Sequence, residues 1–491
     1  MFDYKRFALR KISNVGVNYL PFAAVASDEV PLSRLLRLSL FQVSVGMVLV
    51  LMVGTLNRVM IVELKVPATL VGIMLALPLV FAPFRALIGF RSDRFQSALG
   101  LRRIPYIFKG TMLQFGGFAI MPFALLVLSG YGHAIDAPRW IGLSSAALAF
   151  LLVGAGVHIV QTVGLALATD LVPESDQPKV VGLMSVMLLL GMIISAFCYG
   201  ALLEKYSPGR LIQVIQGTAV VTVALNFYAM WKQEARDRRR AAAPLGPQIS
   251  FAEAWARLIG RVGMFRLLIV IALGTAGVGM ADVLLEPFGG QVLMMTVAQT
   301  TRLSVYLACG SLIGFTLASR WMIRGARPMD MAICGLMVGI PAFGFIVLSS
   351  TMLWMPLLTA ATLVAGFGAG LFGHGTLTAT MRSAPRDQIG LSLGAWGAVQ
   401  ATAAGLSIAV GGTMRDAILA TEAVGSSAAN PYTTVFFTEA GLLTLGLLVA
   451  FPLWGRDAAV SPADDLSRPH HPAAGIDAHG AVAPYADGRA G

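Results

Sequence analysis

Charge is scarce in this sequence. Of its 491 residues, 12% are Asp, Glu, Lys or Arg, roughly half the fraction that soluble globular proteins carry. Hydrophobic residues make up 56% of the chain, and its mean hydropathy is +0.75. These values exclude an ordinary soluble domain and indicate a protein that crosses a membrane several times.

Cysteine is also rare, and Cys198, Cys309 and Cys334 all fall inside apolar runs. Their positions exclude a disulfide framework and show no metal-ligand spacing. The sequence has no HExxH, Walker-type or Gly-x-Ser-x-Gly motif and no carboxylate-rich soluble domain. We therefore expect neither an enzyme, nor a metal site, nor a covalent cofactor.

What the sequence does have is a succession of long apolar runs. A helix that spans a bilayer needs about 20 mostly apolar residues, and by this rule the chain is an all-α membrane protein of twelve transmembrane helices. The predicted limits are 35–57, 68–90, 104–128, 142–168, 179–202, 210–231, 265–288, 297–320, 329–350, 355–380, 388–412 and 433–454.

The net charge of +11 arises mainly from basic residues in alternate loops, before the first span and after spans two, six and eight. The opposite loops hold few basic residues, among them Arg139 and Arg415. Such a bias sets membrane topology and does not indicate nucleic-acid binding. Both termini are therefore expected in the cytoplasm.

The longest internal polar stretch divides the spans six plus six. We expect a cytoplasmic N-terminal arm (1–34), a six-helix half (35–231), a cytoplasmic linker with an amphipathic helix (232–263), a second six-helix half (264–454) and a disordered cytoplasmic tail (455–491). The pair Ala168-Thr169 before Asp176 recurs as Ala379-Thr380 before Asp387, at equivalent places in the two halves. This repeat favours two six-helix pseudo-repeats, as in duplicated transporters.

The loop after the second span carries a recognisable motif of glycine, acidic and basic residues: Gly89, Asp93, Arg94, Arg102 and Arg103. It resembles the cytoplasmic gate motif of the major facilitator superfamily, although the gap between its two basic parts is longer here. The resemblance implies that superfamily's fold. Nearby, Arg85 is expected either to reach the cytoplasmic surface or to pair with Asp170.

Several blocks in separate spans go further: Leu38–Glu63, Leu77–Asp93, Gln114–Gly130 and Asp282–Gly290. Together they resemble the bacteriochlorophyll-delivery branch of that superfamily, the PucC/LhaA-type light-harvesting complex assembly proteins. The resemblance implies a multi-pass protein of the bacterial inner membrane, cytoplasmic or intracytoplasmic. It also implies bacteriochlorophyll as cargo, with antenna polypeptides and pigment-synthesis enzymes as partners.

Five charged residues are expected near the periplasmic ends of spans one, seven and eight: Arg58, Glu63, Asp282, Glu286 and Arg302. Charges within membrane spans are costly and usually functional. One hypothesis is a buried network that links the two halves and controls opening. The alternatives are a static clamp, or carboxylates that simply lie at the water interface.

His158 and Gln161 lie one turn apart in span four, and His374 lies in a glycine-rich part of span ten. A neutral imidazole can ligate the magnesium of a chlorin, so these three residues are pigment-binding candidates. Hydrogen bonding between helices is the alternative role, and it is the role expected of Asn57, Gln114 and Asn226, residues of spans one, three and six.

Two other functions stay open beside pigment delivery. One is a secondary transporter of an amphipathic small molecule, with proton coupling through Asp282 or Glu286. The other is a scaffold for pigment-synthesis enzymes that carries no pigment itself.

Overall fold

The computed structural model describes most of the membrane-spanning part of the chain. The described residues are 31–80, 88, 92, 101, 103–130, 136–173, 176–234, 256, 258–261, 263–383, 389–421 and 428–455. Gly89, Asp93, Arg94 and Arg102 of the gate motif lie outside them, as do Arg85, most of the expected amphipathic helix, and nearly all of the N-terminal arm and the C-terminal tail.

All described secondary structure is helical. The first half consists of α2 (Leu32–Leu38), α3 (Leu40–Leu49), η2 (Val50–Leu56), η3 (Val59–Glu63), α4 (Ala68–Val80), α6 (Ile104–Ser129), α7 (Arg139–Asp170), α8 (Gln177–Leu202) and α9 (Pro208–Met230). The second half consists of α11 (Met264–Gly279), α12 (Ala281–Gln291), α13 (Val297–Ile323), α14 (Pro328–Met352), α15 (Met355–Ser383), α16 (Ile389–Thr421), α17 (Asn430–Ala450) and the short η8 (Phe451–Leu453).

The helices confirm the predicted all-helical membrane fold. Ten of the described helices are long and apolar enough to cross a membrane, and Ala68–Leu79 within α4 is a shorter apolar helix. With α16, which is 33 residues long, the described helices fit the twelve predicted spans in order.

The first span is longer and less regular than the sequence predicts. It runs from Leu32 to Glu63, and its last part is π-helical over Val50–Leu56 and Val59–Glu63. π-Helical segments are rare and concentrate at functional sites. Here the two segments flank Asn57 and Arg58, the residues that reach the other half of the molecule.

The seventh span runs from Met264 to Gln291 and confirms the predicted span, with three further residues at its end. Within it α11 ends at Gly279 and α12 begins at Ala281; the break between them is the single residue Met280, whose backbone dihedral angles are still helical. Gly289 and Gly290, expected in the turn to the next span, are instead the third-last and second-last residues of α12. The turn follows at residues 292–296.

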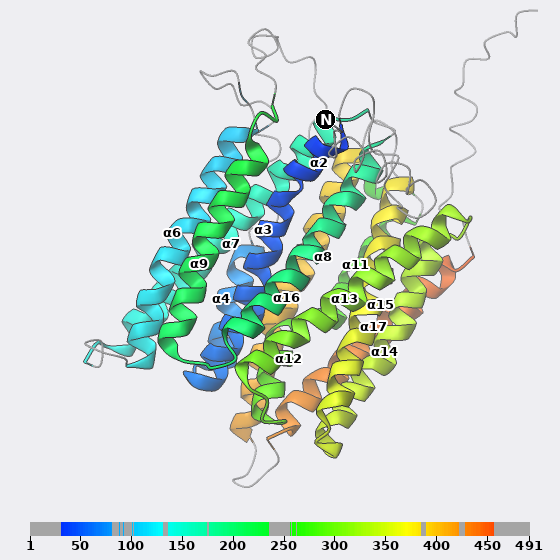
Figure 1. The fold of residues 1–491 in the computed structure, drawn as a ribbon. Helices are drawn as coiled ribbons and strands as arrows, with labels where there is room; N and C mark the ends of the chain where they lie inside the picture. The colour runs from blue at the N-terminus through cyan, green and yellow to red at the C-terminus, as the bar shows by residue number, and fades with distance from the viewer. Residues whose placement is uncertain are drawn as a thin grey trace, which may run out of the picture.

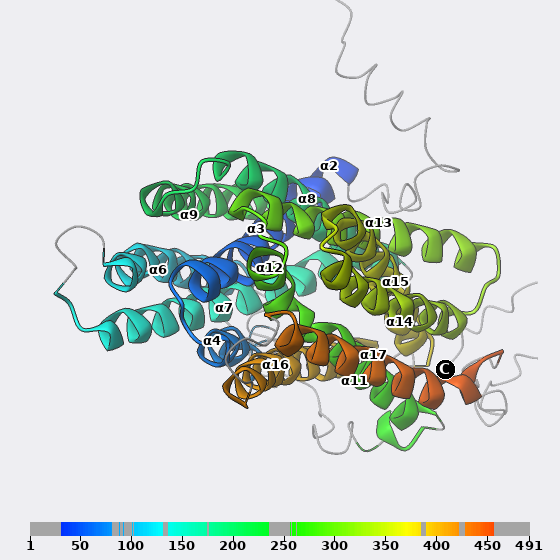
Figure 2. The same cartoon turned by 90° about the horizontal axis from the view of Figure 1, so that it is seen from below.

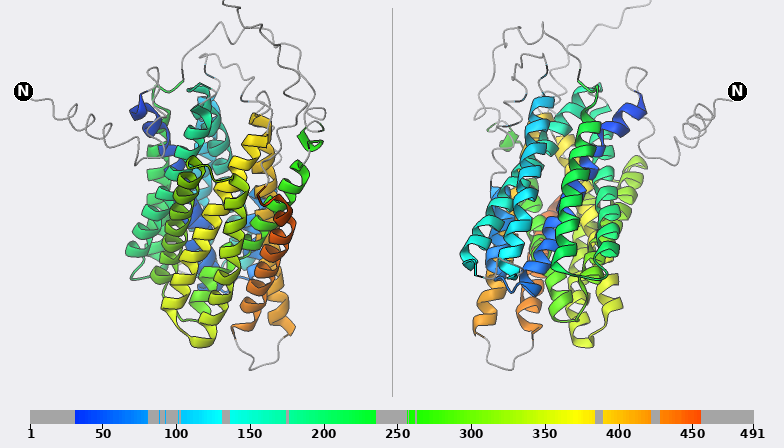
Figure 3. Two further views of the ribbon diagram at one scale, coloured as in Figure 1. Left: turned by 90° about the vertical axis from the view of Figure 1, so that its right-hand side faces the viewer. Right: turned by 60° about the vertical axis from the view of Figure 1, so that its left-hand side comes forward.

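The two halves lie side by side (Figures 1 and 3). Seen along the bundle, α4 lies beside α16 and α8 beside α13, so these pairs join the halves on opposite sides of α12 (Figure 2). Glycine permits the close approach of α4 to α16, because a methyl group at Gly72 would lie 2.9 Å from the carbonyl oxygen of Ile408. At Gly200 of α8 a methyl group would lie 3.2 Å from the Arg302 side chain of α13 and at an ordinary contact distance of 3.4 Å from the Ala298 carbonyl oxygen.

Candidate functional site where the two halves meet

Two polar side chains of the first span hold the second half of the molecule. The fully buried Asn57 donates from Nδ2 to the carbonyl oxygens of Val283, at 2.8 Å, and of Asp282, at 3.3 Å. Arg58 is 3% exposed; it pairs with Glu63 and donates to the Met295 carbonyl oxygen at 3.1 Å. Both bridges lie at the α12 end of the bundle, at the bottom of Figure 1.

The two carboxylates of α12 differ in how far their side chains are exposed. Glu286 is 4% exposed, and its Oε1 accepts a hydrogen bond of 2.8 Å from Ser304. It packs directly on Gly54 of the first span, where any side chain would collide with it. Asp282, one turn earlier, is exposed although the residues on both sides of it, Ala281 and Val283, are buried. Asp282 therefore faces accessible space, whereas Glu286 is part of the contact between the halves.

Arg302 lies apart from these carboxylates. Its side chain is exposed and packs along Gly200 of α8, and it forms no ion pair with any residue that the structure describes. The preceding residue, Thr301, instead joins the halves, because its hydroxyl lies 3.2 Å from that of Thr55.

A second bridge, not anticipated from the sequence, lies at the α4–α16 contact. Asp416 of α16 accepts from the backbone nitrogen and the hydroxyl of Thr69, both at 2.7 Å, at the start of α4. Arg415 was expected in a loop. It is instead 8% exposed and donates to Asp416 and Gln291 at 2.8 Å each. Tyr432 completes the cluster with a bond of 2.6 Å to Gln291.

Glu439 of α17 has a buried carboxyl group and was not among the site residues predicted from the sequence. It is fully buried and accepts a 2.7 Å hydrogen bond from the backbone nitrogen of Ala281. A single glutamate in the middle of an apolar run (Phe436-Phe437-Thr438-Glu439-Ala440) was the available signal, since membrane carboxylates are costly.

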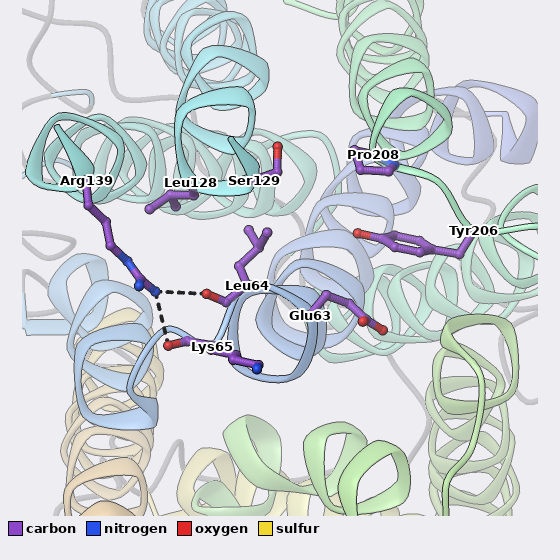
Figure 4. Close-up of a pocket in the computed structure, with 8 residues that line it drawn as sticks. All are labelled: Glu63, Leu64, Lys65, Leu128, Ser129, Arg139, Tyr206 and Pro208. Carbon is purple, nitrogen blue, oxygen red and sulfur yellow. Dashed lines mark hydrogen bonds between the residues drawn. The ribbon is translucent and has the colours of Figure 1, made fainter. Parts of the chain in front are cut away.

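Beside Glu63 the molecule has a small open recess of about 350 Å³ between the loops of the first half, lined by Glu63, Leu64, Lys65, Leu128, Ser129, Arg139, Tyr206 and Pro208 (Figure 4). Arg139 donates to the carbonyl oxygens of Leu64 and Lys65 and so ties the start of α7 to the turn after the first span. Burial, reinforced by the negative charge of Glu63, raises the pKa of Tyr206 to about 12.

The pigment-binding candidates are not brought together. His158 and Gln161 are half-buried on α7, and His374 is half-buried on α15 in the other half. The imidazole of His374 packs on the ring of Phe315 at a centroid distance of 3.9 Å. Its buried Nδ1 has no hydrogen-bond partner among the described residues. The neighbouring Gly373 has open space where a side chain would stand.

At the opposite end of the bundle, Arg103 is the described member of the gate motif. It is 5% exposed and donates to Asp170 at the end of α7, at 3.1 Å, and to Ser92 at 2.7 Å. Asp170 is thus the partner of Arg103, whereas the alternative partner Arg85 lies outside the described residues. Glu234 accepts from the backbone nitrogens of Arg103 and Ile104 and caps α6.

Known structures define the class of protein. A bacterial homologue of the human lysosomal transporter Spinster, in an inward-facing and unoccupied conformation, is similar with a TM-score of 0.63 and 16% identity over 87% of this chain and 97% of that one. A D-xylose-proton symporter is similar with a TM-score of 0.61 and 16% identity over 87% and 98%. With its two six-helix halves, the chain has the major facilitator superfamily fold.

Sequence comparison then gives the family. The family model described as PUCC protein matches residues 55–458, and the chain belongs to this family. It is 62% identical to Protein PucC of Rhodobacter capsulatus over 92% of this chain and 99% of that protein, and 62% identical to Protein PucC of Rhodovulum sulfidophilum over 87% and 94%. A bacteriochlorophyll synthase 44.5 kDa chain of Rhodobacter capsulatus is 28% identical over 78% of this chain and 87% of that one. Membership supports a role in the assembly of photosynthetic complexes.

Proposed function

We propose that the protein binds bacteriochlorophyll in the bacterial inner membrane, cytoplasmic or intracytoplasmic, and delivers it to light-harvesting antenna polypeptides without catalysing a reaction. The family supports the assembly role, and the structural observation that supports pigment binding is the His374 imidazole. A buried ring nitrogen without a partner is unusual in a protein interior. In the proposed complex His374 supplies an axial ligand to the pigment's magnesium, and Gly373 leaves room for a flat ring.

In the proposed function, the polar contacts between the two halves act as a gate at one end of the bundle. The polar contacts that join the two halves in the described residues gather at the α12 end, which the distribution of basic loops assigns to the periplasm. We propose that they hold this end closed while cargo and partners, antenna polypeptides and pigment-synthesis enzymes among them, approach from the membrane or the cytoplasmic side. Both termini then lie in the cytoplasm.

Pigment retention tests the ligand. Wild-type protein and the His374→Ala and His158→Ala variants are purified gently from pigment-producing cells, and bound bacteriochlorophyll is measured by absorbance relative to protein. We expect retention to fall at least fivefold in His374→Ala. The matched control is Phe315→Leu, which keeps the imidazole. Equal pigment in wild type and both histidine variants would exclude an axial-ligand role for either residue.

The gate is tested at Asp282. Because Asp282 is exposed and Asn57 holds only its backbone, we expect Asp282→Asn to insert and fold normally yet to lower antenna levels in cells. Normal antenna absorbance in that variant would refute a role for the carboxylate.

A secondary transporter of an amphipathic small molecule, coupled to protons, is the second candidate. It is supported by Glu286, whose Oε2 is buried with no hydrogen-bond partner among the described residues. A colourless purified protein that moves solute into vesicles along a pH gradient would favour this function over pigment delivery.

A further inference from the structure

The break in the seventh span is held by a side chain from the last span. The backbone nitrogen of Ala281, the first residue of α12, donates to Glu439 Oε1 at 2.7 Å. Glu439 is fully buried and comes from α17, 158 residues further along the chain. The start of α12 is thus fixed by a distant helix of the same half.

This acceptor meets a need that the break creates. The first turn of a helix has backbone N–H groups without partners inside the helix, and within a membrane such groups must be satisfied by the protein itself. The Met280 side chain at the break makes no capping bond. Glu439 supplies the acceptor for the Ala281 N–H instead.

Tight packing from α16 leaves the break little freedom of its own. A methyl group at Gly279 would collide with Ser407, and one at Gly411 would lie 2.8 Å from Met280 Cβ. Helix α16 thus packs closely on Gly279 and Met280, whereas Glu439 of α17 accepts from the backbone at the start of α12. Asp282 is the next residue after that bond, and it lies close enough to Glu439 for the two charges to interact.

We propose that Glu439 is a positioning residue. Its side-chain Oε1 fixes the rotation of α12 about the helix axis, so that Asp282 faces accessible space while Val283 and Glu286 face the first half. This inference rests on the proposed gate, because it assigns Glu439 the task of orienting the carboxylate on which the gate depends. The oxygen acts as an acceptor, so an amide in its place serves equally well.

Thiol reactivity measures the rotation directly. In a background with Cys198→Ser, Cys309→Ala and Cys334→Ala, a single cysteine is placed by Asp282→Cys or by Val283→Cys. The reaction rate of each with a small hydrophilic maleimide is measured on purified protein. The quantity compared is the rate at position 282 divided by the rate at position 283. This ratio is expected to be large when Glu439 is present (the Glu439 background) and in Glu439→Gln.

The ratio is expected to fall at least fivefold in Glu439→Leu, which removes the acceptor. Phe437→Ala, an exposed neighbour on α17, is the matched control and should leave the ratio unchanged.

Two results would overturn the proposal: an unchanged ratio in Glu439→Leu, or a ratio in Glu439→Gln at least fivefold below that in the Glu439 background, which can be read even if Glu439→Leu does not fold. The measurement needs neither pigment nor antenna. Failure of the Asp282→Asn test in cells would therefore refute the proposed function and leave this inference standing.

Discussion

Loss of the Asp416 carboxylate should weaken the closed state of the α12 end by a measurable amount. Asp416 accepts three hydrogen bonds, two of them from Thr69 in the other half. Removal of a capping side chain costs about 1 kcal/mol, and a hydrogen bond to a charged group contributes about 1.5–3 kcal/mol. Because the Asp416 side chain is 20% exposed, water offsets part of this loss. We expect a net cost of about 2 kcal/mol, or about a 30-fold change in the ratio of closed to open molecules.

The assay uses a cysteine that only the open state exposes. Thr301 is fully buried between the halves, so the modification rate of Thr301→Cys, in a background without native cysteines, is proportional to the open fraction when the closed state dominates. Asp416→Ala should raise this rate about 30-fold, and Asp416→Asn, which keeps one acceptor oxygen, should raise it less.

Asp330→Ala is the control, because among the described residues Asp330 accepts only from Gly455, at the opposite end of the bundle, and it should leave the rate unchanged. The reasoning assumes that each half moves as a rigid body, so that loosening α4 from α16 also opens the contact at Thr301. A rate in Asp416→Ala within threefold of the control would refute it.

Three further predictions concern contacts elsewhere in the fold. Gly72→Ala should destabilise the protein by about 1–3 kcal/mol because it overpacks the backbone of α16, whereas Gly217→Ala, with open space around it, should not; thermal unfolding of both compares them. Arg103→Lys should lower the unfolding temperature, because lysine cannot reproduce the fork of donors that joins two partners; an unchanged temperature would contradict this. The neutral form of Tyr206 is favoured in the fold, where burial and Glu63 raise the pKa of its hydroxyl to about 12. Stability is therefore lost as pH rises above about 10, where the unfolded tyrosine ionises, and Tyr206→Phe should lose less between pH 9 and 11.5.

The parts of the fold that depend on hydrophobic length were predictable, and the parts that depend on contacts between distant helices were not. Hydropathy locates the limits of α6 or α13 within three residues, because the bilayer requires a fixed length of apolar chain. Nothing local in the sequence marks the π-helical end of the first span. Its widened turns are stabilised by bonds from Asn57 and Arg58 to carbonyl oxygens more than 220 residues away.

The candidate site shows the same limit. Sequence spacing selects Asp282 and Glu286 as a pair on one helical face, but it cannot show that one is exposed and the other buried. Arg58 and Arg302 were both expected in one charge network, yet among the described residues Arg58 donates a hydrogen bond to the other half, whereas Arg302 only packs along Gly200. Glu439 was missed because its partner is a backbone nitrogen, which leaves no trace in side-chain spacing.

These differences bear on what the seventh span does. Glu286 is bonded to Ser304 within its own half and packs on Gly54 of the other half, so separation of the halves at the α12 end breaks its contact with Gly54. Among the described residues Asp282 is bound through its backbone oxygen, to which Asn57 donates, and its carboxylate has no hydrogen-bond partner. The backbone nitrogen of the preceding residue, Ala281, is held by Glu439. A break in a membrane helix, capped by a buried glutamate from another span, is thus a way to fix the position of a carboxylate that no described residue engages.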